Sequence, residues 1–207
     1  MATPTASAAV PATCTLTSEE TEGPYYINLN LIRADITEGK PGTPLKLMIT
    51  VRNSTTCHPI QNAAVDVWHC DAGGVYSGYG AASTGGGPGG GGTPTDKLTF
   101  LRGIQMTDAL GVATIQTIYP GWYRGRAVHI HVKVHVGSNV VHTGQLFFPD
   151  DLTDKVYRAD PYAARGTRDV LNSADSIFTG GGSTGIPTMT QNGSGHTGAI
   201  TLSVRQT

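Results

Sequence analysis

Residues 119–136 read YPGWYRGRAVHIHVKVHV, and from residue 128 onward apolar and polar side chains alternate strictly. Successive side chains of a β-strand point to opposite faces of its sheet, so the alternation predicts a strand with one buried face. The opposite face carries three histidines and a lysine, which either meet solvent or form a site. The apolar face holds Val128, Ile130, Val132, Val134 and Val136, and the opposite face holds His129, His131, Lys133 and His135.

The rest of the chain has the pattern of an all-β protein. Its 207 residues are enough to bury a core within one domain. Its 28 glycines and 12 prolines favour strands joined by turns over helices. The sequence therefore predicts a β-sandwich core with long loops and little helix, with one short helix over 167–178. Further strands are expected at 45–51, 63–69, 99–107, 111–118, 140–148 and 199–205.

The N-terminus and the cysteines bear on domain limits and compartment. Residues 1–13 are rich in Ala, Thr and Pro, so we expect a flexible N-terminal linker followed by a single domain over 14–207. Three cysteines allow three disulfide pairings, of which we favour Cys14–Cys57 and leave Cys70 free. The small size, the linker and the odd cysteine count together favour a secreted, extracellular protein. No basic start or apolar signal-peptide core is present, so a leader would have been removed.

Charge and hydropathy give no support for several classes of partner. The formal net charge is -1, which offers no basis for a nucleic-acid or membrane-surface partner. No apolar run approaches the roughly 20 residues of a transmembrane helix. No CxxC pair is present, so a zinc ribbon or a thioredoxin-type motif has no support.

His129 and His131 are candidate metal ligands because of their spacing. Residues two apart on a strand share a face and lie about 6.6 Å apart along the chain, so their imidazoles can converge on one ion. For an HxH pair alone, a solvated strand face is the better interpretation. The neighbourhood favours a site, because Tyr123 and Arg126 precede the pair within one loop. Tyr76 follows a Gly-Gly turn, and Gln145 lies on the next predicted strand, so all six side chains can face one cavity.

Two tyrosines and two histidines suit a particular kind of metal ion. A phenolate is a hard anionic oxygen donor, which matches hard and highly charged cations. Free tyrosine has a pKa of about 10, so it ionises at neutral pH only beside a strong positive charge such as a metal ion. Two phenolates and a hydroxide would neutralise a trivalent ion, and ferric iron is the natural candidate. No carboxylate is well placed in this set, which argues against a ferrous 2-His-1-carboxylate site.

Several motifs in order resemble those of the intradiol ring-cleavage dioxygenases, especially the compact secreted-type branch. They are TEGPYY (21–26), DVWHCDAGGVYSGY (66–79), PGWYRGRAVHIH (120–131) and GQLFF (144–148), within roughly residues 14–150. The resemblance implies a β-sandwich, a non-haem mononuclear Fe(III) and cleavage of catechol-type aromatics with O2 to cis,cis-muconate-type diacids. It implies iron ligation by Tyr76, Tyr123, His129 and His131.

The resemblance also implies roles around the metal. Tyr123 matches the tyrosine that leaves the metal when substrate binds, and Arg126 matches the arginine placed over the substrate ring. Gln145 matches a glutamine beside the site. Gly23, Pro24, Tyr25 and Gly74 match segments that line the substrate pocket. Larger members of the family carry a long helical N-terminal dimerisation region that this chain lacks, so we expect a monomer or a weak homo-oligomer.

Two other functions compete with this hypothesis. The first is a non-catalytic β-sandwich module that binds a sugar or an aromatic ligand through its His and Tyr face. The second is a zinc or copper enzyme that uses His129, His131 and His69. The remaining polar residues have simple expectations: Lys133 and His135 are solvated, and His142 is a surface residue. Each metal-binding histidine is expected to be oriented by a hydrogen bond through its other nitrogen.

Overall fold

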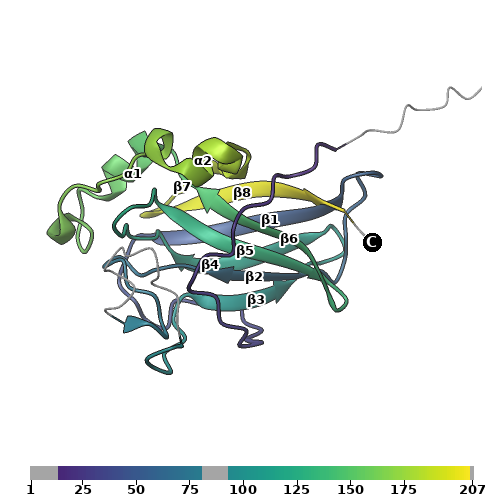
Figure 1. Ribbon diagram of the computed structural model, residues 1–207, viewed down its shortest axis with the longest axis horizontal. Helices are drawn as coiled ribbons and strands as arrows, with labels where there is room; N and C mark the ends of the chain where they lie inside the picture. Colours follow the sequence, from purple (N-terminus) through teal and green to yellow (C-terminus); the bar gives the residue numbers. More distant parts are fainter. Residues whose placement is uncertain (1–13, 81–92, 206–207) are drawn as a thin grey trace, which may run out of the picture.

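Eight strands among the described residues form two four-stranded sheets that pack as a sandwich (Figure 1). The structure is a computed structural model that describes residues 14–80 and 93–205, so the predicted linker 1–13 lies outside the described residues. One sheet has the order β4-β1-β8-β7 and the other β3-β2-β5-β6, which confirms the all-β sandwich. The strands are β1 Pro44–Asn53, β2 Ala64–Trp68, β3 Arg102–Met106, β4 Val112–Ile118, β5 His129–Val136, β6 Asn139–Phe147, β7 Thr188–Asn192 and β8 Gly195–Val204.

The alternation of β5 places its valine face in the core, as the sequence predicts. Ile130, Val132 and Val134 are fully buried, and they share one hydrophobic cluster with Leu47 and Ile49 of the facing sheet. β5 pairs antiparallel with β2 on one side and β6 on the other, so it is a central strand. Its histidine face therefore points out of the sandwich, where loops can cover it.

Little helix is present, as predicted, and the predicted helical span 167–178 is helical only in part. In place of one helix over 167–178, the chain forms the 3-10 turn η3 (Asn172–Ala174) and the short helix α2 (Ser176–Gly180), so the predicted start at 167 is wrong. The α-helix starts late because the Asp175 side chain accepts hydrogen bonds from the backbone of Ile177 and Phe178, which fixes the helix start there. The upstream residues make tertiary contacts instead, since Arg168 pairs with Asp150 and Asp154. The other short helices are α1 (Asp150–Val156), η2 (Ala163–Arg165) and η4 (Gly182–Gly185).

Strand β7 has no signal in the sequence. Its residues read TMTQN, four of the five are exposed, and it pairs only with β8 at the edge of its sheet. An exposed edge strand needs no apolar face, so hydrophobic alternation does not reveal it. No helix in the described parts of the chain is long and apolar enough to cross a membrane.

An N-terminal strap, residues 14–27, crosses the strands before the first sheet begins (Figure 1, dark purple). Its start is fixed by a disulfide between Cys14 and Cys57, which confirms the favoured pairing, and Cys70 is free and buried. The backbone of Thr17 then bonds to Ser203 of β8, and the backbone of Glu20 bonds to Thr143 of β6. The strap thereby contacts both sheets and reaches the outer face of β5.

Removing the disulfide is expected to destabilise the protein by about 2–4 kcal/mol, because the bond closes a loop across a sequence separation of 43 residues. The measurement is urea denaturation of the double variant Cys14→Ser/Cys57→Ser against the wild type. Dithiothreitol serves as the control, since reduction should bring the wild type to the stability of the variant. Equal midpoints under oxidising conditions would contradict the expectation.

Candidate metal centre

Four side chains form a buried Tyr–His cluster on the outer face of β5: Tyr76, Tyr123, His129 and His131. Both histidines come from β5, Tyr123 from the loop before it, and Tyr76 from the loop after β2. Their exposed fractions are 0%, 7%, 2% and 0% in residue order, so solvent barely reaches the cluster. The residues that the sequence singled out are thus gathered in one place, and their role as metal ligands stays a prediction.

Nε2 of His129 lies within hydrogen-bonding distance of two other donor atoms of the cluster. Nε2 of His129 lies 3.1 Å from Nε2 of His131 and 3.1 Å from the hydroxyl oxygen of Tyr123. The ring of Tyr76 is 5.6 Å from that of Tyr123 and 6.0 Å from that of His131, measured between centroids. Two nitrogen and two oxygen donors therefore converge from three segments of the chain.

The tautomer of His129 follows from its second nitrogen. Nδ1 lies 2.7 Å from the carbonyl oxygen of Ala127, which can only accept, so Nδ1 donates its hydrogen. Burial, with the charge of Arg126, holds the pKa of His129 well below its usual range, so the ring is neutral at neutral pH. A neutral ring that donates from Nδ1 carries its lone pair on Nε2, inside the cluster. This nitrogen has the state that metal binding requires.

His131 is oriented by packing. Its ring stacks on Trp68, with centroids 4.9 Å apart and planes only 3° from parallel. The backbone of Gly23 also comes so close that an added Cβ would lie 2.8 Å from Cε1 of the ring. Among the described residues, Nδ1 of His131 has no hydrogen-bond partner, so the expected orienting bond exists for His129 and not for His131. Burial and the neighbouring His129 also hold the pKa of His131 well below its usual range.

The two phenols fit a strongly charged cation. Burial raises the pKa of both Tyr76 and Tyr123 above the ordinary value, so each phenol keeps its proton without a nearby positive charge. A cation that reached the cluster would therefore meet two neutral imidazoles and two acids that can each become an anion. Hard oxygen anions with imidazole match ferric iron, so the residues present fit that group.

Arg126 and Gln145 flank the cluster as the sequence predicts. Gln145 lies opposite His131 in the β5–β6 register. Its side-chain oxygen accepts a 2.6 Å hydrogen bond from Nη2 of Arg126, and its side-chain nitrogen donates to the backbone oxygen of Thr21. The Nε of Arg126 donates a 2.8 Å hydrogen bond to the carboxylate of Asp175. Asp175 is not among the site residues predicted from the sequence.

The strap covers the cluster through its aromatic residues. Tyr25 stacks on Tyr76 with ring centroids 4.6 Å apart, and it is 4% exposed. Tyr26 packs against Trp68, with centroids 4.8 Å apart. Tyr25 thus belongs to the wall of the cluster, while Pro24 beside it is exposed, and the expected place of both residues in a substrate pocket stays a prediction.

Two expectations about solvated residues are wrong because of this cover. Lys133 is 9% exposed, pairs with Glu22 of the strap and lies 3.9 Å above the ring of Tyr26. Its charge therefore binds the strap to β5 through an ion pair and a cation–π contact. His142 is 2% exposed on β6 and is not a surface residue, whereas His135 at the end of β5 is half-buried.

Arg102 is a residue that sequence reasoning missed. It is 3% exposed on β3, and its guanidinium donates to the backbone oxygens of Tyr25 and Ser77 and to the side chain of Ser77. Arg102 therefore joins the strap to the loop that carries Tyr76. An arginine within the apolar strand segment TFLRGIQMT was the available signal, since a buried guanidinium needs several acceptors.

His69 is not available as a third imidazole ligand. Its Nδ1 lies 2.8 Å from the backbone oxygen of Cys70 and its Nε2 lies 2.7 Å from the hydroxyl of Thr117, so both nitrogens are engaged. Over residues 14–80 and 93–205, no group of three His, Cys, Asp or Glu side chains is placed to hold a metal ion. The structure therefore gives no support to the zinc or copper hypothesis with His69.

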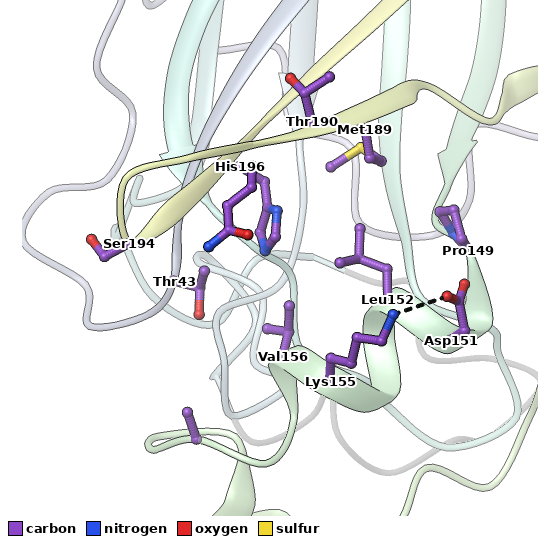
Figure 2. Close-up of a pocket in the computed structure, with 12 residues that line it drawn as sticks. Thr43, Pro149, Asp151, Leu152, Lys155, Val156, Met189, Thr190, Ser194 and His196 are labelled. Atoms are coloured by element: carbon purple, nitrogen blue, oxygen red, sulfur yellow. Dashed lines mark hydrogen bonds and ion pairs between the residues drawn. The ribbon is translucent and has the colours of Figure 1, made fainter.

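A surface cavity elsewhere on the molecule is unrelated to the Tyr–His cluster. It is a groove of about 550 Å³ between α1 and the β7–β8 hairpin, with Leu152, Met189 and His196 on its walls (Figure 2). Its one ion pair joins Lys155 and Asp151, which are both mostly exposed, and such pairs contribute little. The volume of this groove is by itself no evidence that it is an active site.

Gly74 lies beneath the loop that carries Tyr123. A Cβ at this position would come within 2.3 Å of the backbone oxygen of Trp122 and closer still to Arg165. The glycine, at φ +81°, therefore allows the Tyr76 and Tyr123 loops to pack together. Its expected place in the lining of a substrate pocket stays a prediction.

Comparison with known proteins gives full-length matches at the level of structure, while no family model and no curated protein matches the sequence. An intradiol ring-cleavage dioxygenase from Tetranychus urticae is 32% identical with a TM-score of 0.83, over 93% of this chain and 95% of that one. A further dioxygenase crystal structure is 34% identical with a TM-score of 0.87, over the same shares of 93% and 95%. The dioxygenase domain of a carbohydrate-binding fusion protein from Streptomyces sp. SirexAA-E is 28% identical with a TM-score of 0.67, over 93% and 100%.

Substituting Gly23 by alanine is expected to displace the imidazole of His131 and to weaken metal binding by about tenfold or more. The reason is the 2.8 Å approach of the new Cβ to Cε1, added to the strain of a side chain at φ +72°. The measurement is the affinity of the metal-free protein for Fe(III).

Gly39→Ala is the matched control, since Gly39 has φ +74° and nothing within 4 Å of its added Cβ. Both variants should lose about 1–2 kcal/mol of stability through backbone strain, and only Gly23→Ala should lose metal affinity. Equal affinities in the two variants would contradict the packing of Gly23 on His131.

Proposed function

Because the chain belongs to the intradiol ring-cleavage dioxygenase family, we propose that it cleaves catechol-type aromatics with O2 between the two hydroxyl-bearing carbons. The product would be a cis,cis-muconate-type diacid that contains both oxygen atoms of O2. We propose Tyr76, Tyr123, His129 and His131 as the ligands of a mononuclear Fe(III). The observation that carries the proposal is the convergence of two neutral imidazoles and two phenols in one buried cluster.

The proposed iron would make the ring carbon of a bound catecholate electron-rich enough for O2 to attack. The residues of the chain supply the rest of the chemistry. A catechol must lose two protons and take up two coordination positions when it binds. Tyr123 is the proposed leaving ligand, and its phenolate oxygen would accept one of these protons, while a hydroxide at the site would accept the other and leave as water. Tyr123 is also the most exposed member of the Tyr–His cluster, in a loop and not on the central strand, which supports this assignment.

Arg126 is proposed to stabilise negative charge that develops on the substrate ring. Its guanidinium is a permanent positive charge beside a buried cluster, where such a charge acts more strongly than in water. Gln145 would hold one end of this guanidinium, since its oxygen accepts from Nη2. Gly23, Pro24 and Tyr25 are proposed to line the ring pocket, with Gly74 beneath the neighbouring loop.

Substrate and compartment are extensions of the same proposal. No basic side chain was singled out for a substrate carboxylate, so we propose catechol or hydroxyquinol over protocatechuate. The protein is proposed to act outside the cell, and the disulfide Cys14–Cys57 suits an oxidising compartment.

The purified protein is expected to contain one iron per chain, to be burgundy through tyrosinate-to-Fe(III) charge transfer, and to convert catechol to a muconate-type diacid. Elemental analysis, the visible spectrum and product identification over a panel of catechols test this directly. A colourless, metal-free protein that binds aromatics or sugars would favour the non-catalytic module. Zinc or copper in place of iron would favour a hydrolase or oxidase and overturn the proposal.

Single substitutions in the Tyr–His cluster should separate the four ligands by role. His129→Ala and Tyr76→Phe are expected to lose the iron or to bleach the visible band. Tyr123→Phe is expected to keep some iron and to slow the spectral change on adding catechol, because the leaving phenolate is absent. Iron content and stopped-flow spectra provide the measurements, and a wild-type spectrum and activity in His129→Ala would show the ligand assignment to be wrong.

A further inference from the structure

Asp175 forms the closest contact of Arg126 with an acidic group, and it comes from a region without recognisable motifs. The carboxylate is 2% exposed and receives four hydrogen bonds. One oxygen accepts from Nε of Arg126 and from the backbone nitrogen of Ala127, each at 2.8 Å. The other oxygen accepts from the backbone nitrogens of Ile177 and Phe178, at the start of α2.

These contacts keep Asp175 ionised. Burial opposes ionisation, but the hydrogen bonds and charge of Arg126 and the backbone donors hold the pKa of this carboxyl below its ordinary value. A buried anion fixed by four donors is a rigid anchor, because moving it would leave a charge without partners.

The anchor fixes the plane of a side chain that is otherwise flexible. Arginine has a long rotatable stem and a planar fork of five N–H donors. Asp175 holds Nε and Gln145 holds Nη2, so two of the three guanidinium nitrogens are fixed. Among the described residues Nη1 donates no hydrogen bond, and the Arg126 side chain is 19% exposed. The remaining N–H groups of Arg126 therefore point in a fixed direction, in which they can donate to another molecule.

We propose that Asp175 is a positioning residue that holds the Arg126 guanidinium in the orientation needed over the substrate ring. This inference rests on the proposed function, in which Arg126 stabilises charge on that ring. It gives the segment after residue 150 a part in the reaction, since α2 is built on the same carboxylate. The contact of Phe178 with Phe147, with ring centroids 5.2 Å apart, packs this segment against β6.

Orientation and charge make opposite predictions for the removal of Asp175. The carboxylate neutralises part of the positive charge of Arg126, so its loss would strengthen the field beside the substrate. If charge alone mattered, Asp175→Asn would raise kcat/KM. If orientation matters, the freed guanidinium loses its alignment, and kcat/KM falls by about tenfold to a hundredfold.

Asp175→Asn is the informative variant, because asparagine is as good an N-cap as aspartate and can still begin α2. We expect kcat/KM per bound iron to fall at least about tenfold. In an Arg126→Ala background the same change should alter kcat/KM less than about twofold, because the residue acts through Arg126. A wild-type or raised kcat/KM, or losses that multiply in the double variant, would overturn the proposal.

Asp150→Asn is the matched control. Asp150 likewise pairs with a buried arginine, Arg168, and accepts from a backbone nitrogen, that of Asn172, outside the Tyr–His cluster. The Asp150→Asn substitution should lower the melting temperature and leave kcat/KM per iron within about twofold of wild type, because it removes an ion pair that is only structural. A loss in this control equal to that of Asp175→Asn would reduce Asp175 to a structural role.

A wild-type measurement keeps the proposal testable if Asp175→Asn does not fold. In the metal-free protein, the Nε–H of Arg126 should exchange with solvent at least about tenfold more slowly than that of the exposed Arg124, as followed by nitrogen-15 NMR. Equal exchange rates would refute the anchor. A wild-type protein without iron or turnover would refute the proposed function and leave this exchange result unaffected, so the two failures are distinguishable.

Discussion

Buried imidazoles stay neutral, and His129 and His131 lie with their Nε2 atoms 3.1 Å apart where solvent barely reaches them. Two protonated rings could not lie at this distance in a dry site, because like charges repel strongly at low dielectric. Burial therefore sets their chemistry, since neutral rings carry no charge that would repel a cation. The surrounding residues either keep water away from these two rings or fix their orientation. Ala127 aims one ring by a hydrogen bond, and Trp68 aims the other by stacking.

The cover over the rings depends on contacts that are distant in sequence. The strap is tied at its start by the Cys14–Cys57 disulfide and, further along, by Lys133 and Arg102. Each tie uses a polar or covalent bond where a typical outer sheet face would meet water. The proposed metal centre would lie on this outward face, and the cover limits the access of water to its proposed ligands. Stability of the strap and integrity of the Tyr–His cluster are consequently linked.

The sequence predicted what depends on local pattern. The alternation around Ile130 fixed the buried face of β5, and the HxH spacing placed two imidazoles side by side on the other face. Alternation reports which side chains share a face, and it cannot report what covers that face. Lys133 was therefore expected in solvent although Glu22, 111 residues away, pairs with it. The helix expected over 167–178 is shorter and interrupted for a related reason, because polar residues of this segment such as Arg168 contact other segments.

The recognisable motifs end near residue 150, yet a residue beyond that point, Asp175, contacts Arg126. A guanidinium can be held only by acceptors with matching geometry, and Gln145 supplies one of the two anchors from within a motif. The second anchor, Asp175, lies in a stretch whose turns and short helices have no periodicity to read. In the sequence Asp175 looks like an ordinary N-cap residue, and in the structure it does cap α2. One carboxylate thus begins a helix and orients an arginine, and a residue with a complete structural explanation can still carry part of the chemistry.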